Sequence, residues 1–228
     1  MKNNPAKKNR TQESVFIFTI VLLSFLLWNT IFIYPIKIFV VFLHESSHAI
    51  AILLTGGRIA EISLGFNLGG KIITEGGNDM AIASSGYLGS LIFGLLIFIS
   101  SELQKVRRYI FLALAFLLLA ITLISTPSLE FILIGIITIG ILVFFAFFVR
   151  ILLVKLIAKS FALVSSIYVI IDIKEDMLND VFSSDAHILA GLLGMDQIII
   201  SFLWLVSSII LIWITVRLSF QKGNSKHL

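Results

Sequence analysis

The stretch FLHESSHAIAILLTGG, residues 42–57, places two histidines and a glutamate in a run that is otherwise apolar and ends at a glycine pair. Ionisable side chains are rare inside membrane-spanning segments, and those that occur there are functional by default. The fold class therefore depends on whether this stretch lies in a membrane. The function depends on which group compensates the charge of the two histidines and the glutamate.

The composition of the chain indicates what those surroundings are. Of 228 residues, 58% are hydrophobic and only 13% are charged, and the mean hydropathy is +1.07. A soluble domain carries about 25% charged residues. Too much apolar surface would remain in water, so the composition excludes a soluble globular protein and predicts an all-α polytopic membrane protein. The lack of cysteine excludes disulfides and thiolate metal ligands.

Hydropathy divides the chain into about seven apolar segments, each close to the roughly 20 residues that cross a bilayer. We expect about six to seven transmembrane helices in a single domain over residues 15–217, between basic tails at 1–14 and 218–228. Segment 15–34 is too long for the apolar region of a signal peptide and is interpreted as a retained first span. The expected segments are 15–34, 36–54, 80–100, 106–125, 129–149, 151–172 and 196–216.

Two polar stretches interrupt the apolar pattern. Residues 55–79 contain glycine pairs and short runs in which polar and apolar residues alternate, which predicts a β-hairpin. Residues 173–195 predict a connection in which a short helix begins at Ser183-Ser184-Asp185. Four predicted crossings separate the two stretches, so we expect both to face the same side of the membrane.

The net charge of +4 comes mainly from basic residues in the tails and near the ends of the apolar segments. Next to membrane spans, this pattern indicates orientation by the positive-inside rule rather than nucleic-acid binding. If all the predicted segments cross, the positive charges are distributed against that rule. If segment 36–54 enters without crossing, they agree with it. Its length and its lack of a helix breaker favour a full crossing, so the sequence leaves both schemes open.

The HExxH pattern at residues 44–48 predicts a metal site. His44 and His48 lie one turn apart on the same face of a helix, so both imidazoles can reach a tetrahedral Zn²⁺ at about 2.0–2.1 Å. Glu45 can then take a proton from water in an open coordination position. Three other interpretations of the cluster stay open: hydrogen bonding within the bundle, a proton relay in a membrane transporter or proton-coupled carrier, and a non-catalytic zinc-stabilised scaffold.

Six stretches of the chain form a wider pattern: HESSHA at 44–49, TGG at 55–57, GG at 69–70, ASSGYLGS at 83–90, YVIIDI at 168–173 and SSDA at 183–186. Together they resemble the site-2-protease class of intramembrane zinc metallopeptidases, and most closely its small subgroup without a PDZ domain. The resemblance implies cleavage of peptide bonds within or beside the membrane. One zinc ion would be held by His44, His48 and a distant aspartate, with Glu45 as the general base. We expect a membrane-embedded or juxtamembrane protein substrate, no nucleic-acid partner, and a multi-pass location in the cell membrane of a bacterium.

The third zinc ligand does not follow from a motif, because the Asn-x-x-Pro-x-x-x-Leu-Asp-Gly pattern of better-known members of the class is absent. Asp172 is the preferred ligand, because a carboxylate at the end of an apolar span needs a partner. Asp185 is the alternative ligand, although its position could also make it the cap of a helix over 186–192. His187 is expected to be a solvated loop histidine. The other carboxylates considered are Glu175, Asp176 and Asp180.

The predicted hairpin could bind the substrate. A helical substrate must unwind to expose its carbonyls, and an exposed β edge beside the zinc would bind the unwound segment as an added strand. We expect Ile62 and Ile72 on that edge, against the alternative of a glycine-rich loop that only links two spans. Small residues at Ala83, Gly86 and Gly89 predict that the helix over 80–100 packs closely on the zinc-bearing helix.

Overall fold

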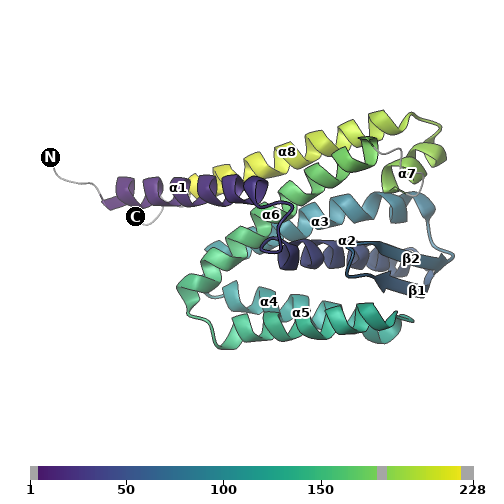
Figure 1. Cartoon of the computed structure of the whole chain (residues 1–228), viewed down its shortest axis with the longest axis horizontal. Coiled ribbons are helices and arrows are strands. Elements are labelled where there is room, and N and C mark those ends of the chain that lie inside the picture. The colour runs from purple at the N-terminus through teal and green to yellow at the C-terminus, as the bar shows by residue number, and fades with distance from the viewer. Residues whose placement is uncertain (1–4, 179–183, 222–228) are drawn as a thin grey trace.

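The computed structural model describes residues 5–178 and 184–221, and Figure 1 shows how they are arranged. The fold is a set of helices with one small antiparallel sheet, as the sequence predicts. In chain order the elements are α1 (Pro5–Leu26), α2 (Tyr34–Leu54), β1 (Arg58–Leu64), β2 (Gly70–Glu75), α3 (Asp79–Glu102), α4 (Arg107–Ile124), α5 (Leu129–Phe147), α6 (Ile151–Leu178), α7 (Asp185–Leu193) and α8 (Gln197–Gln221).

Among the described residues, six helices are long and apolar enough to cross a membrane: α2, α3, α4, α5, α6 and α8. Large apolar side chains such as Phe116, Leu123 and Ile136 are exposed on the outside of the bundle. Apolar surface of this extent marks contact with a membrane. The core lies between the helices, and α2 contributes the fully buried Phe42 and Leu43. The prediction of a multi-pass membrane protein is confirmed.

The N-terminal segment differs from the predicted first span at 15–34. Helix α1 ends at Leu26, and its apolar part, Val15–Leu26, is shorter than the helices that could cross. The chain then turns before α2 begins at Tyr34, with Pro35 in the first turn of α2. Proline lacks the N–H group that a continuous helix would need here, and it also restricts the residue before it. The predicted span is therefore the apolar end of α1 followed by a turn, whereas segment 36–54 is part of a full-length apolar helix.

Strands β1 and β2 form the antiparallel hairpin that the sequence predicts at 55–79. Its turn is closed by the Gly65 N–H, which donates to the Gly69 carbonyl at 2.9 Å. The other edge of β1 is bonded to the connection before α5. There the Ile62 N–H donates to the Thr126 carbonyl at 3.2 Å, and the Ser128 N–H donates to the Ile62 carbonyl at 3.0 Å. The hairpin is thus attached to the helix bundle through β1.

The turn of the hairpin is held by side chains from two helices. The Phe66 N–H donates to Glu130 Oε2 of α5 at 3.1 Å, and the Phe66 carbonyl accepts a hydrogen bond from the Tyr34 hydroxyl of α2. Leu68 in the same turn has φ of 68°, a left-handed conformation that is uncommon for residues other than glycine. The position of the turn is therefore set by α2 and α5 together.

Helix α3 packs closely on the helix that carries the HExxH pattern. A Cβ atom on Gly89 would overlap the Ser47 side chain of α2, so a larger residue would push the two helices apart. Further along α3, Gly94 faces Ala162 and Ser165 of α6. The close packing predicted from the small residues of this helix is confirmed.

Helix α7 begins where the sequence predicts a helix start. The Ser184 hydroxyl is the N-cap and accepts a hydrogen bond from the His187 N–H at 3.2 Å, and Gly194 ends the helix with φ of 64°. The buried side chains of α7 join a small apolar cluster with α3 and α8 that includes Tyr87 and Trp204. This packing holds Asp185, the first residue of α7, against the bundle.

Candidate metal centre

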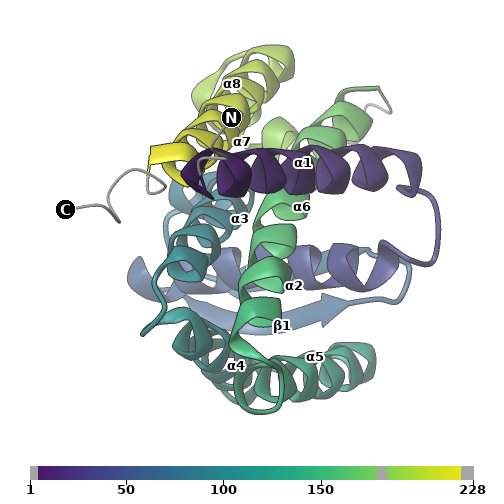
Figure 2. The same ribbon diagram turned by 90° about the vertical axis from the view of Figure 1, so that its left-hand side faces the viewer.

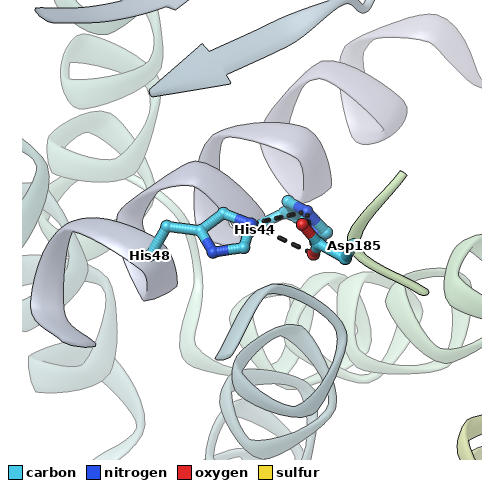
Figure 3. A group of neighbouring side chains, drawn as sticks. All are labelled: His44, His48 and Asp185. Atoms are coloured by element: carbon cyan, nitrogen blue, oxygen red, sulfur yellow. Dashed lines mark hydrogen bonds and ion pairs between the residues drawn. The ribbon is translucent and has the colours of Figure 1, made fainter. Parts of the chain in front are cut away.

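The two histidines of the HExxH pattern point away from α2 on the same face of the helix, as Figure 3 shows. Their Nε2 atoms lie 3.1 Å apart. The two rings pack edge to face, with an angle of 76° between their planes. His48 is buried, and His44 is half-buried with its ring against that of Tyr87, 5.1 Å between centroids. The spacing of four residues thus brings together two nitrogens that could bind one metal ion.

A hydrogen bond from Nδ1 of His48 determines that Nε2 is the ring nitrogen that faces His44 and Asp185. Nδ1 of His48 lies 2.8 Å from the Ile82 carbonyl of α3. A carbonyl can only accept, so Nδ1 carries the proton and Nε2 keeps a free lone pair. Ser85 supports the same arrangement, because its hydroxyl donates to the Ile82 carbonyl at 2.6 Å and lies 3.2 Å from Nδ1. Partners of this kind orient metal-binding histidines in known metal sites.

Asp185 brings a carboxylate to the two histidines from the far end of the chain. Its Oδ2 atom lies 3.2 Å from Nε2 of His44 and 3.1 Å from Nε2 of His48, and Figure 3 shows the three side chains converging. Ser184 supplies the N-cap of α7, so the Asp185 side chain is not needed for that role. The three residues form the one group of described His, Asp and Glu side chains that could hold a metal ion.

The separations within this group fit a tetrahedral ion. Ligand atoms bound to one zinc at about 2.0–2.1 Å lie about 3.3 Å from one another, and the three observed distances are 3.1, 3.2 and 3.1 Å. Asp185 Oδ2 is also buried, and the two imidazole nitrogens are the polar atoms that it faces. The residues therefore fit a divalent cation that three protein side chains would hold.

The charge state of Asp185 suits a metal ligand. Burial alone would raise the pKa of its carboxyl group, but the neighbouring His48 and His44 act in the opposite direction and hold that pKa below its ordinary value. The ionised form is the one that binds metal. The Asp185 carboxyl group is therefore ionised, as a metal ligand must be.

Glu45 lies beside this group and is only 5% exposed. Its carboxylate is packed against Gly70, the first residue of β2, and a Cβ atom on Gly70 would overlap it. On the other side of the centre, a Cβ atom on Gly86 would overlap both Asp185 and His44. Glycine at these two positions lets β2 and α3 come close enough to enclose the centre.

Asp172, the preferred third ligand from the sequence, lines the same cavity but is not part of the group that converges on one point. His187 lies in the first turn of α7, where its Nδ1 is 3.2 Å from Gln197 Oε1. Asp180 falls outside the described residues, and so do the side chains of Glu175 and Asp176.

A cavity of about 730 Å³ extends from the candidate centre between the hairpin and α7. Ile72 of β2 lines it, together with Leu68 from the turn and Ile188 from α7. Ile62, the other expected edge residue, is fully buried, and its peptide groups are bonded to the connection before α5. Both polar stretches of the sequence therefore contribute to one cavity, and β2 is the strand that faces it.

Sequence reasoning did not assign functional roles to three features of this centre: the Ile82 carbonyl, Gly70 and Tyr87. The glycine pair at 69–70 and the small-residue run at 83–90 were visible as patterns. They did not show that Gly70 would meet Glu45 or that Tyr87 would pack on His44, because those contacts depend on how α3 and the hairpin approach α2.

Taken together, a multi-pass bundle and a buried His–His–Asp group beside a glutamate define a membrane protein with a candidate catalytic metal centre. The model of the Peptidase M50B-like family matches residues 17–215, so the chain belongs to this family, the site-2 protease family. Membership makes it an intramembrane metallopeptidase at the level of the family, whose members use zinc. Comparisons with curated proteins and with solved structures give no significant match. The resemblance indicated by the sequence motifs is confirmed.

Proposed function

We propose that the chain is a zinc metalloendopeptidase that hydrolyses peptide bonds in or beside the membrane, with Glu45 as the general base. The observation that carries the proposal is the convergence of His44, His48 and Asp185 beside this buried glutamate. A structural zinc site is usually closed by four protein ligands. The group of described residues offers three, which leaves a position for water.

Each residue of the centre has a defined role in this proposal. His44, His48 and Asp185 hold the zinc ion, which when bound supplies a Lewis acid and lowers the pKa of a coordinated water. Glu45 accepts a proton from the attacking water and passes it to the nitrogen of the leaving amine. Its burial keeps bulk water away from the carboxylate, and its contact with Gly70 keeps it in one place.

The proposal takes Asp185 as the third ligand in place of Asp172, because Asp185 Oδ2 lies at ligand spacing from both imidazoles. Metal analysis of two purified variants tests this assignment. Asp185→Ala should lose bound zinc, whereas Asp172→Ala should keep it. Zinc at the wild-type level in Asp185→Ala would exclude Asp185 as a ligand.

The free edge of β2 is the proposed binding site for the substrate strand. Hydrogen-bonded pairs alternate along an antiparallel hairpin, and the bond from Gly65 to Gly69 defines which pairs they are. By this alternation Gly70 and Ile72 direct their peptide groups to the outer edge, where no other described backbone segment bonds to them. A peptide added at this edge would lie beside Glu45.

The same alternation explains why the proposal includes Ile72 and leaves out Ile62. On β1 it directs the peptide groups of Ile62 away from β2, and these groups are the ones that bond to Thr126 and Ser128. Proline at Ile72 should therefore abolish turnover while zinc stays bound, because it removes the outward N–H and disturbs the strand. Unchanged turnover would count against strand addition.

Glu45→Gln is the experiment that separates a peptidase from a zinc-stabilised scaffold. The amide keeps the shape of the side chain but cannot act as the base, so turnover of a panel of single-span peptides should be lost while zinc remains bound. A scaffold would tolerate the change in every assay. Wild-type turnover in Glu45→Gln would refute the role given to Glu45.

A further inference from the structure

One end of the helix bundle carries the hairpin and the candidate centre, and we call it the hairpin end. It comprises the β1–β2 hairpin, the connection 125–128 between α4 and α5, and helix α7. Ile62 bonds to this connection at Thr126, and residues of the hairpin and of α7 line the cavity together. The candidate metal centre therefore belongs to the hairpin end.

The opposite end is formed by the connections 103–106 and 148–150, and we call it the loop end. Arg107 donates to the Ile151 carbonyl at 3.2 Å, and Arg108 donates to the Val149 carbonyl at 3.0 Å. These bonds join the two connections, which lie on the left in Figure 1, away from the hairpin.

The six helices that can cross a membrane run alternately between these two ends. Helix α2 leads to the hairpin, α3 leads away from it, and α4 returns to the connection 125–128. Because the number of crossings is even, the start of α2 and the end of α8 lie at the same end. Figures 1 and 2 both show the start of α1 beside the end of α8. The two ends are thus opposite faces of the membrane domain.

The basic residues are distributed unevenly between these faces. Of the 17 Lys and Arg residues of the chain, three belong to the hairpin end: Arg58, Lys71 and Lys174. All the others precede α2, follow the membrane part of α8, lie in the first turns of α2 and α4 or in the loop-end connections, or lie in the first three turns of α6. Those around the two connections are Lys105, Arg107, Arg108, Arg150, Lys155 and Lys159.

Carboxylates are distributed in the opposite way, with few at the loop end and more at the hairpin end. At the loop end Glu102 contacts Lys159 at 2.5 Å and Lys155 at 3.4 Å, so two lysines share one carboxylate. The hairpin end instead exposes a series of acidic residues, Glu61, Glu75, Asp79, Glu130 and Asp196. The two faces therefore differ in the sign of their charge.

We propose that the hairpin end faces away from the cytosol. Short connections rich in Lys and Arg are retained on the cytosolic side of membranes, and anionic lipids of the cytosolic leaflet attract them. The cavity then receives substrate from the non-cytosolic side. Its substrate class is membrane proteins whose cleaved region lies in the non-cytosolic half of the bilayer. The substrate class rests on the proposed function, whereas the orientation does not.

The short apolar part of α1, Val15–Leu26, explains why hydropathy alone left two schemes open. A seventh crossing at 15–34 would put the basic N-terminal tail on the face opposite the C-terminal tail. Because the apolar part of α1, Val15–Leu26, is too short to cross and α2 is of full length, the start of α1, the end of α8 and both loop-end connections fall on one face. Helix length and charge then support the same orientation.

Cysteine labelling tests the orientation directly, because the chain has no cysteine of its own. Gly191 of α7 is exposed at the hairpin end with open space for a side chain, and Gln104 is exposed at the loop end. In intact cells a membrane-impermeant maleimide should label Gly191→Cys, and it should label Gln104→Cys only after permeabilisation. Gly140→Cys, on the exposed face of α5 and also with open space, is the matched control and should stay unlabelled in both conditions.

Labelling of Gln104→Cys in intact cells would overturn the proposal, whether or not Gly191→Cys also reacts. If Gly191→Cys reacts in neither intact nor permeabilised cells, Glu75→Cys on the exposed end of β2 takes its place. Protection of Glu75→Cys until permeabilisation would equally overturn the proposed orientation.

The substrate class is tested with two single-span substrates that carry the same cleavable sequence in opposite halves of the bilayer. Cleavage should be about tenfold faster when the sequence lies in the non-cytosolic half, and it should be absent with Glu45→Gln enzyme. A preference for the cytosolic half would overturn the substrate class. Cleavage of neither substrate, with Gly191→Cys labelled as expected, would count against the peptidase function and leave the orientation intact.

Discussion

Replacing Gly70 with alanine should disable the general base without removing the metal. A Cβ atom at this position would overlap the Glu45 carboxylate and lie 2.9 Å from its Cγ, whereas ordinary contact begins at 3.4 Å. The carboxylate is buried, so it cannot simply swing into solvent. Either the strand or the base must move by about 1 Å, and a misplacement of about 1 Å can cost roughly 100-fold in rate. We expect a loss of turnover of that order.

The neighbouring Gly69 provides the matched control. The atoms nearest to a Cβ atom on Gly69 belong to the Asn67 side chain, at 3.2 Å and in an exposed turn, so Gly69→Ala should keep most of the activity. Both variants would be assayed for initial cleavage rate, bound zinc and unfolding temperature in the same detergent. Zinc should stay at the wild-type level in both, because the atoms nearest to the new methyl groups belong to Glu45 and Asn67 and not to the proposed ligands.

Two results would refute this reasoning. If Gly70→Ala cleaves at the wild-type rate, then either Glu45 is not the base or β2 does not hold it in place. If Gly70→Ala loses zinc while Gly69→Ala keeps it, the contact supports the metal ligands rather than the base. A loss of unfolding stability similar to the 1–3 kcal/mol of an overpacked core is compatible with the prediction, because the assay compares rates of folded enzyme.

Three other perturbations have defined outcomes. Glu130→Leu removes the acceptor of the Phe66 N–H and should lower turnover severalfold, since one hydrogen bond contributes about 1 kcal/mol, whereas Glu130→Gln keeps an acceptor and should retain activity; equal rates in both variants would exclude a role for this bond. Gly89→Leu should lower the free energy of unfolding by about 1–3 kcal/mol, measured by denaturant titration, because its side chain would overlap Ser47; an unchanged midpoint would contradict the close packing. A chelator should lower the unfolding temperature of the wild type and leave that of Asp185→Ala unchanged, because only a protein that binds zinc is stabilised by it; an equal shift in both proteins would argue against this ligand.

The parts of the site that lie on one helix could be predicted from the sequence. His44 and His48 share a face because of the geometry of an α-helix, and this needs no knowledge of the rest of the fold. Their Nε2 atoms do lie 3.1 Å apart. The hairpin is a similar case, because glycine pairs and alternating residues specify a turn between two short strands through local preferences.

Which aspartate converges on the two histidines depends on tertiary structure, and the sequence alone favoured Asp172 over Asp185. Asp172 ends an apolar run, which makes it conspicuous in a hydropathy pattern. Asp185 follows a polar connection, and nothing local shows that α7 packs back against α3 and α8. That packing, anchored by Ala186 and Leu189, is what brings the first residue of α7 to the two histidines.

The first span illustrates a different limit. Hydropathy averages over a window, so the run 15–34 scores as one segment although it contains a turn. In the structure the Thr30 hydroxyl donates to the Leu27 carbonyl within this turn, and Lys37 lies 4.3 Å from the ring centre of Trp28. These polar contacts, together with Pro35, end one helix and start the next. The pattern of apolar residues alone cannot distinguish this arrangement from a crossing.

The charges of the proposed centre cancel, and this explains how α2 can bury a polar cluster. A divalent ion, the Asp185 carboxylate and the Glu45 carboxylate together carry no net charge when both histidines are neutral. An uncompensated charge in a medium of low dielectric constant is costly, so a neutral set is the least unfavourable way to bury these groups. None of the compensating groups except Glu45 comes from α2 itself. The ion is exogenous and Asp185 arrives from α7, while Gly70 and Gly86 leave the space in which the set can assemble. Folding of α7 onto the bundle and binding of the metal are therefore expected to be coupled, since each leaves buried charge unbalanced without the other.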